Sequence, residues 1–128
     1  MDRTVLVRCD VEAGIRLADG LESLKVPVSA CLWCSFARAK RWQLMIATPL
    51  VDEKGLRNAY MRIHKAVDKL TPPNDIDWLD IEAISPKDPI IKWMKARFGT
   101  GAKAVGRKVS DANIHGVSIA GACICRLQ

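Results

Sequence analysis

The strongest constraint on the fold of this chain is a change of hydrophobic period within residues 42–70. Over residues 42–47, apolar side chains occupy both alternating faces, as in a β-strand buried inside a sheet. After Pro49, apolar side chains recur at steps of three and four residues, as on one face of an α-helix. Proline offers no N–H to a sheet and keeps the preceding residue extended, so the strand ends there. The segment therefore predicts a strand followed by a helix, with Asp52 or Gly55 as its cap.

Two elements are expected before this segment. Residues 3–25 have the helical period and predict a long amphipathic helix. Its internal Gly14 and Gly20 each cost about 1 kcal/mol relative to alanine, so a break near Asp10 is an alternative. Residues 28–36 alternate as a strand, and the short polar connection that follows predicts antiparallel pairing with the next strand.

The second half of the chain predicts three strands and one helix. A proline-rich turn precedes a third strand at residues 79–85. Asp88 and Pro89 form the clearest helix start, a capping side chain followed by proline at the first helical position. That short helix ends in the glycines of residues 99–101. Two further strands are expected at residues 104–109 and 117–127. Residues 110–116 are expected to form the turn between them.

This order of elements predicts a single α+β domain over residues 1–128. Single helices between antiparallel hairpins are typical of a two-layer domain. We expect a mixed, mostly antiparallel sheet of about five strands with three helices on one face, in the order α-β-β-α-β-α-β-β. The other face would then be open. Because several strands are apolar on both faces, we expect that face to pack against another copy, as a homodimer.

Several features of the sequence indicate a cytoplasmic protein. The longest apolar runs fall short of the roughly 20 residues that cross a membrane, so no membrane partner is expected. The N-terminal residues carry acidic side chains and no long apolar segment, which argues against a secretory signal. The five cysteines are an odd number without secretory context, which favours reduced thiols rather than disulfides.

The spacing of the cysteines raises the alternatives of a metal site or a redox site. Cys31 and Cys34 have the spacing of half a zinc site or of a redox motif, but on a strand they point to opposite faces. Cys123 and Cys125 share a strand face and could bind a metal with Cys9 or His115. Packing of both as small apolar side chains is the favoured interpretation. We therefore expect no metal and no cofactor.

Catalytic alternatives lack a local signature. His64 falls on the central helix and His115 in a turn, and neither has a motif partner. An acidic run, Asp75, Asp77, Asp80 and Glu82, could hold a metal as carboxylates do in magnesium-dependent nucleases. Asp80 and Glu82 share a strand face, but the next position on that face is Ile84 rather than a lysine. An enzyme whose pocket is built from distant residues stays an alternative. A deep cleft that holds a histidine with a carboxylate or a thiol would favour it.

The net charge of +6 is concentrated in the last third of the chain. Residues 1–86 hold 12 Lys and Arg against 12 Asp and Glu, whereas residues 87–128 hold 8 against 2. A one-sided basic region can bind anions or nucleic acid. The chain has few aromatic side chains to stack bases, and a solvated basic face is the competing interpretation. The candidate contact residues are Lys92, Lys95, Arg97, Lys103, Arg107 and Lys108.

The glycine-rich segment at residues 99–106 could add backbone amides that cradle a phosphate. It differs from the Walker motif, because it follows a helix rather than a strand. A glycine stop for the helix, flanked by solvated lysines, is the simpler interpretation.

Several segments resemble a group of small bacterial hypothetical proteins, of the kind that also occurs on integron gene cassettes. They are ACLW at 30–33, WQLMIATPLVDEKG at 42–55, AYMRI at 59–63, ISPKDPII at 84–91 and HGVSIAGACICRL at 115–127. The resemblance implies no assigned activity and no catalytic residues. Because the sequence has a good core pattern and no catalytic signature, we expect a non-enzymatic binding or accessory module that acts as a homo-oligomer. A nucleic-acid-associated protein and an enzyme with a scattered pocket are the alternatives.

Overall fold

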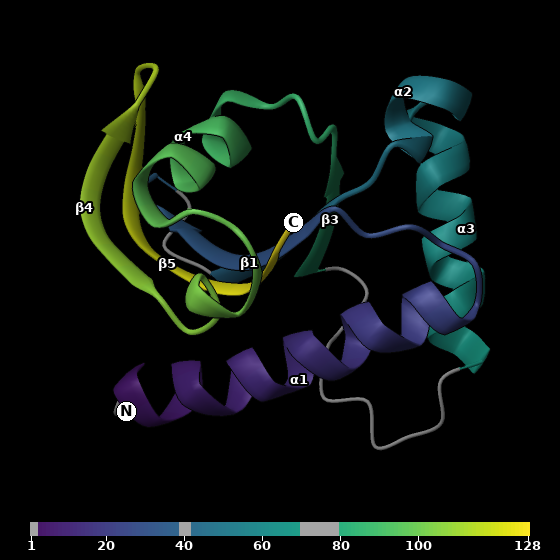
Figure 1. Ribbon diagram of the computed structural model, residues 1–128, viewed down its shortest axis with the longest axis horizontal. Coiled ribbons are helices and arrows are strands. Elements are labelled where there is room, and N and C mark those ends of the chain that lie inside the picture. The colour runs from purple at the N-terminus through teal and green to yellow at the C-terminus, as the bar shows by residue number, and fades with distance from the viewer. Residues whose placement is uncertain (1–2, 39–41, 70–79) are drawn as a thin grey trace.

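The computed structural model describes residues 3–38, 42–69 and 80–128, with side chains from residue 11 onward (Figure 1). The elements are α1 (Arg3–Ser23), β1 (Ala30–Phe36), β2 (Trp42–Ala47), α2 (Leu50–Lys54), α3 (Leu56–Lys69), β3 (Ile81–Ile84), α4 (Pro89–Phe98), η2 (Gly101–Lys103), β4 (Lys108–Ile114) and β5 (Val117–Leu127). Within these residues no helix combines the length and the apolar character needed to cross a lipid bilayer.

The five strands form one mixed sheet in the order β3-β2-β1-β5-β4. The β2–β3 pair is parallel, and the other three pairs are antiparallel. A parallel pair needs a crossover connection, which α2 and α3 supply between β2 and β3. The α+β class, the five-stranded mixed sheet and the order of strands and helices are thus confirmed.

The helices are divided between the two faces of the sheet. Helices α1 and α3 pack on the face that carries Trp33 and Leu44. Helix α4 packs on the face that carries Leu32 and Met45, through its buried Ile91 and neighbouring apolar side chains. Figure 1 shows α1 crossing below the sheet while β4 and β5 curve around α4 on the other side. The expectation that helices cover one face only is corrected, because a helix pattern shows which side is apolar but not which sheet face it meets.

This arrangement removes the argument for a dimer through an open sheet face. The strands are apolar on both faces, as expected, but α4 of the same chain covers the second face. Helix α4 begins with Asp88, whose side chain accepts a hydrogen bond from the Ile90 N–H, and Pro89 occupies the first turn. The predicted helix start is therefore confirmed. The homodimer itself stays a prediction.

The helix expected after Asp52 or Gly55 begins directly after Gly55, as α3, and the Ala59 N–H bonds to the Gly55 carbonyl. The separate short helix α2 precedes it. Gly55 has a φ of 87°, a left-handed value that glycine adopts without steric cost and that a regular helix does not contain. As a consequence Leu56, expected on the buried stripe, is 51% exposed, whereas Ala59 and Ile63 are buried. The last position expected on that stripe, residue 70, lies outside the described residues.

The strand predicted at residues 104–109 lies instead at Lys108–Ile114. Ala104 is a buried residue of the turn after η2, and its N–H bonds to the Gly101 carbonyl. The polar residues expected to form a turn are the exposed side of β4, where an edge strand tolerates polar side chains. The turn itself is confined to His115 and Gly116, with φ values of 50° and 83°. Positive φ at both positions is typical of a tight hairpin turn.

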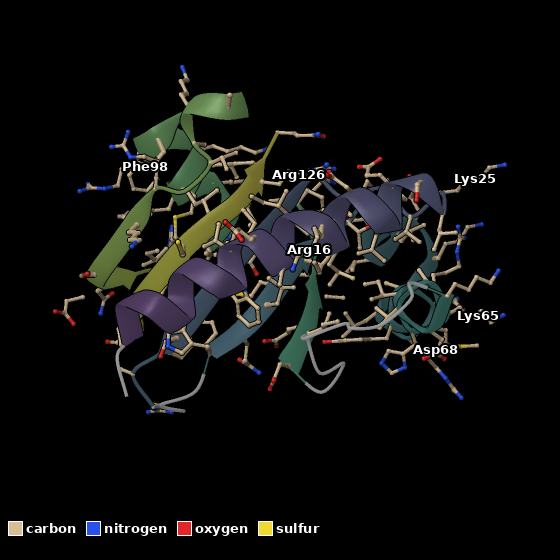
Figure 2. All side chains as sticks on the ribbon, turned by 90° about the horizontal axis from the view of Figure 1, so that it is seen from below. Arg16, Lys25, Lys65, Asp68, Phe98 and Arg126 are labelled. Carbon is tan, nitrogen blue, oxygen red and sulfur yellow. The ribbon has the colours of Figure 1, made fainter. Side chains whose placement is uncertain are left out.

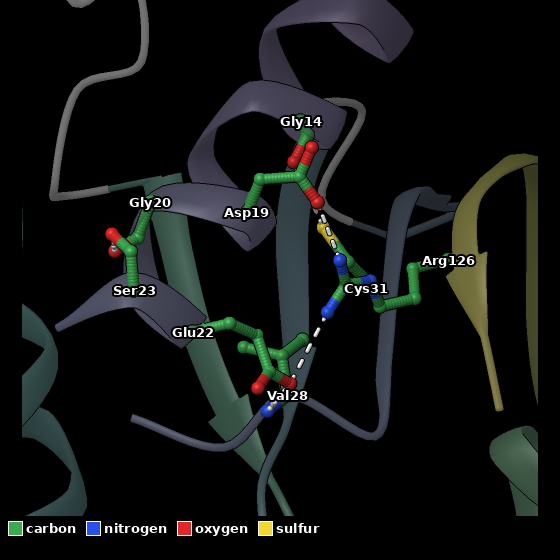
Figure 3. A network of polar contacts seen from close by, with 8 residues as sticks. All are labelled: Gly14, Asp19, Gly20, Glu22, Ser23, Val28, Cys31 and Arg126. Atoms are coloured by element: carbon green, nitrogen blue, oxygen red, sulfur yellow. Dashed lines mark hydrogen bonds and ion pairs between the residues drawn. The ribbon is translucent and has the colours of Figure 1, made fainter. Parts of the chain in front are cut away.

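An ion-pair network joins α1 to one end of the sheet, where β1 begins and β5 ends (Figure 3). The Arg126 guanidinium at the end of β5 pairs with Asp19 and Glu22 of α1. The Glu22 carboxylate also accepts a hydrogen bond of 2.8 Å from the Val28 N–H, just before β1. The exposed side of α1 is thus connected to two strands that are adjacent in the sheet.

Gly14 lets α1 approach β5 closely. A Cβ at this position would lie 2.6 Å from Cys125 Sγ, and the nearest atom of Trp33 would be 3.4 Å away. The Gly14 carbonyl also accepts a hydrogen bond from the Cys31 thiol, with an S···O distance of 3.7 Å. The glycine that weakens the helix pattern in the sequence is therefore required by packing.

We predict that Gly14→Ala lowers the free energy of unfolding. Overpacking costs about 1–3 kcal/mol, which exceeds the roughly 1 kcal/mol that alanine gains over glycine inside a helix. Chemical denaturation of the wild type, Gly14→Ala, Cys125→Ala and the double variant measures the effect. In the Cys125→Ala background the added methyl has room, so Gly14→Ala should become neutral or stabilising there. Equal effects in both backgrounds would contradict this packing.

Candidate functional site

The candidate basic residues are only partly brought together. Arg97 and Arg107 flank the ring of Phe98, with Cζ-to-centroid distances of 5.7 Å and 5.1 Å. Arg97 also lies 5.4 Å from the centroid of the Trp93 ring. A guanidinium within about 6 Å of an aromatic ring is in cation–π range. The two arginines thus form an arginine–aromatic cluster at the end of α4.

The lysines in the candidate set have different positions. Lys103 lies against the backbone of Gly99, since a Cβ there would be 2.4 Å from Lys103 Cε. Lys92 is an exposed residue of α4, and Lys95 lies in the last turn of that helix. Lys108 pairs in register with Cys123, so it lies toward the face covered by α1. Burial raises the pKa of the Cys123 thiol to about 11, and the nearby charge of Lys108 offsets this rise only in part. The structure therefore separates Lys108 from the other five residues.

Several amides of the glycine-rich segment are bonded within the chain and are therefore not available to a phosphate. The Gly99 N–H bonds to the Lys95 carbonyl, and the Gly106 N–H bonds to the Ile124 carbonyl. The N–H groups of Ala104, Val105 and Arg107 also bond to carbonyls within the chain. Helix termination, the simpler interpretation of these glycines, accounts for the segment.

The four cysteines whose side chains the structure describes are buried and form no disulfide. Cys31 belongs to the core between the sheet and α1, and Cys34 to the core under α4, so the two thiols point to opposite faces as expected. Cys123 and Cys125 share the first of these cores. The His, Cys, Asp and Glu side chains of the described residues form no group of three that could hold a metal ion. Residues 75 and 77 of the acidic run lie outside the described residues.

A cleft of about 560 Å³ lies on the α4 side of the sheet. It is bounded by the ends of β1, β2 and β3, by the start of α4, and by the turn between β4 and β5. Its apolar lining consists of Phe36, Met45, Ile84, Pro89, Ile90, Ile114 and Val117.

The polar lining of this cleft is acidic. It consists of Gln43, Glu82, Asp88 and His115. Asp88 Oδ1 is also the helix cap, 2.9 Å from the Ile90 nitrogen. The lining residues that the structure describes thus include two carboxylates and no lysine or arginine, in a protein whose formal net charge is +6. A cleft lined by one sign of charge concentrates its field on a bound ligand.

The strand register brings Cys34 beside the acidic side of the cleft. Cys34 pairs with Gln43 across β1 and β2, and Glu82 pairs with Met45 across β2 and β3. Burial and, to a smaller extent, the charge of Glu82 raise the pKa of the Cys34 thiol to about 12. The thiol is therefore protonated at neutral pH and is no nucleophile there, since the thiolate is the reactive form.

The sequence singled out two polar residues of the cleft for chemistry, Glu82 and His115, but as separate candidates. The sequence did not indicate that Gln43 lines the cleft, and it predicted Asp88 only as a helix cap. Gln43 was the available signal, because it is the single polar side chain on its face of an otherwise apolar strand. Nothing in the sequence, however, places the β4–β5 turn over the ends of β2 and β3.

Comparison with protein-family models, curated proteins and solved structures gave no match. The resemblance to small bacterial hypothetical proteins therefore stays a prediction. The function must be inferred from the geometry described above.

We predict that stability falls at alkaline pH through Cys34. The ordinary thiol pKa of 9.0 applies to the unfolded chain and a value of about 12 to the folded protein. The stabilising effect is complete below pH 9. It is lost as the pH rises toward 12, because the unfolded state releases its proton first, at about 1.4 kcal/mol per pH unit. Unfolding in guanidinium chloride from pH 8.5 to 10.5 should show a shallower decline for Cys34→Ala, and parallel curves would contradict the assignment.

Proposed function

We propose that the protein is a cytoplasmic, non-enzymatic binding module that takes a small ligand with an apolar body and a cationic group. The acidic cleft on the α4 side is the observation that carries this proposal. Four buried cysteines that form no disulfide support a reducing compartment.

The charge of the cleft supports a cationic ligand group. Glu82 is half-buried on β3, and Asp88 stands across the cleft at the start of α4. Hydrogen bonds to ionised carboxylates are roughly twice as strong as those between neutral groups. An anionic ligand would instead meet two like charges in a partly desolvated site.

The apolar lining supports a ligand with a hydrocarbon or aromatic body. Phe36 and Met45 contribute a ring and a flexible thioether, which adapt to irregular ligand shapes. A mostly apolar cleft with a few convergent polar groups is the usual form of a small-molecule site. Its volume of about 560 Å³ also falls in the range of such sites.

The test compares two probes of similar size and opposite charge, phenethylamine and phenylacetate. We expect phenethylamine to shift backbone NMR signals around the cleft and to bind more tightly than phenylacetate. Glu82→Gln should weaken amine binding by about tenfold, the loss expected for one charge-assisted hydrogen bond. Glu12→Gln removes the same charge from the exposed side of α1 and serves as the matched control. Amine binding that is unchanged by Glu82→Gln, or signal shifts elsewhere, would contradict the proposal.

A second candidate, an enzyme, is favoured by one observation. His115 and Glu82 line the same cleft, and a histidine with a carboxylate can transfer protons during a reaction. His115→Asn removes the imidazole, while asparagine tolerates the left-handed backbone at this position. If the cleft is catalytic, turnover in a screen of ester and amide substrates should be abolished by His115→Asn without loss of folding. Turnover that persists in the variant would exclude this role of His115.

A further inference from the structure

A basic surface that the charge count along the sequence does not reveal lies on α3. The helix carries Arg57, Arg62, Lys65 and Lys69 against one acidic side chain, Asp68. Residues 1–86 contain equal numbers of basic and acidic side chains, so the net charge of this region does not reveal the local excess of basic residues on α3. Figure 2 places Lys65 at one end of the molecule and Phe98, in the arginine–aromatic cluster, at the other.

Two neighbouring hollows follow the exposed side of α3. One, of about 290 Å³, is lined by Lys54, Asn58, Met61, Arg62 and Lys65. The other, of about 160 Å³, is lined by Leu24, Val26, Arg62, Lys65, Ala66 and Lys69. Arg62 and Lys65 line both hollows, and neither hollow has a carboxylate among its described lining residues.

The central cation of this surface is held in place. Arg62 Nη2 donates a hydrogen bond of 3.2 Å to the carbonyl oxygen of Lys25, at the turn that follows α1. The guanidinium keeps further N–H donors for a ligand. Met61, on the rim, is 50% exposed. A positioned arginine loses less side-chain freedom when it binds an anion than a freely moving one would.

The arrangement of charges suits a linear polyanion. Lys54, Arg62, Lys65 and Lys69 line the adjoining hollows on one exposed side of the α2–α3 segment. Steps of three and four residues along a helix advance about 5–6 Å. One strand of duplex DNA carries a phosphate per about 3.4 Å of axis, so each cation can meet a phosphate.

We propose that this face of the α2–α3 segment, comprising Lys54, Arg62, Lys65 and Lys69, binds the phosphodiester backbone of a nucleic-acid duplex. Proteins that hold single strands add aromatic side chains on which bases stack, and none lines the described part of these hollows. Contacts to phosphates alone fix position without reading sequence. The binding is therefore independent of base sequence. The site is separate from the acidic cleft and does not depend on the proposed ligand.

The test measures fluorescence anisotropy of a labelled mixed-sequence DNA duplex at low and moderate salt. Two double variants remove equal positive charge from the two basic surfaces. Arg62→Gln/Lys65→Gln alters α3, and Lys92→Gln/Lys95→Gln alters α4. We expect the α3 variant to weaken binding at least about tenfold. The slope of the logarithm of the binding constant against the logarithm of the salt concentration should become shallower by the amount expected for about two lost phosphate contacts. The α4 variant should bind within about threefold of the wild type.

Each other outcome overturns the proposal. Absence of salt-sensitive binding by the wild type would contradict the proposal. Equal weakening by both variants would mean that the α3 cations contribute only through the net charge of the protein. Preference for a single strand of the same length would contradict the duplex assignment. Polyglutamate that displaces the duplex at matched charge concentration would assign the surface to an acidic polypeptide instead. Lys65→Gln/Lys69→Gln, which keeps the Arg62 hydrogen bond, repeats the test if the first α3 variant shows a changed thermal unfolding midpoint.

Discussion

Burial of both faces of the central strand β1 is the constraint on which the rest of the structure depends. Residues 30–35 of this strand are all buried, and their side chains alternate between the two cores. A strand of this kind is stable only when each face is covered by apolar side chains, because burial of apolar surface is the main favourable contribution to folding. Helices α1 and α3 cover one face and α4 covers the other.

The position of α4 also creates the candidate binding site. Its first turn lines the cleft together with residues of β2 and β3 and with the β4–β5 turn. The capping carboxylate that starts the helix, Asp88, becomes part of the lining. One short helix thus closes a core and contributes an acidic group to a cleft. Helix α4 also covers Cys34, which is buried and lies near enough to Glu82 for the carboxylate charge to raise the pKa of the thiol.

Opposite charges are separated on this protein. The cleft is acidic, whereas the exposed side of α3 and the end of α4 are basic. The arginines at the end of α4 stack on aromatic rings, while Arg62 on α3 bonds to a backbone carbonyl beside open hollows. Two basic regions of similar composition therefore differ in what surrounds their cations. That difference could not be read from the charge of the last third of the chain.

The sequence by itself determined the class, the order of the elements and the pairing of β1 with β2, because these follow from local periodicity and from Asp88 and Pro89. It also placed Cys31 and Cys34 on opposite faces, since strand geometry has a period of two. The true position of β4 and the sheet face that α4 covers were decided by tertiary packing. Tertiary packing also creates the cleft, because Gln43, Glu82 and His115 come from segments far apart in the chain. Such residues become neighbours only through pairing and packing over long sequence distances, which no local pattern encodes.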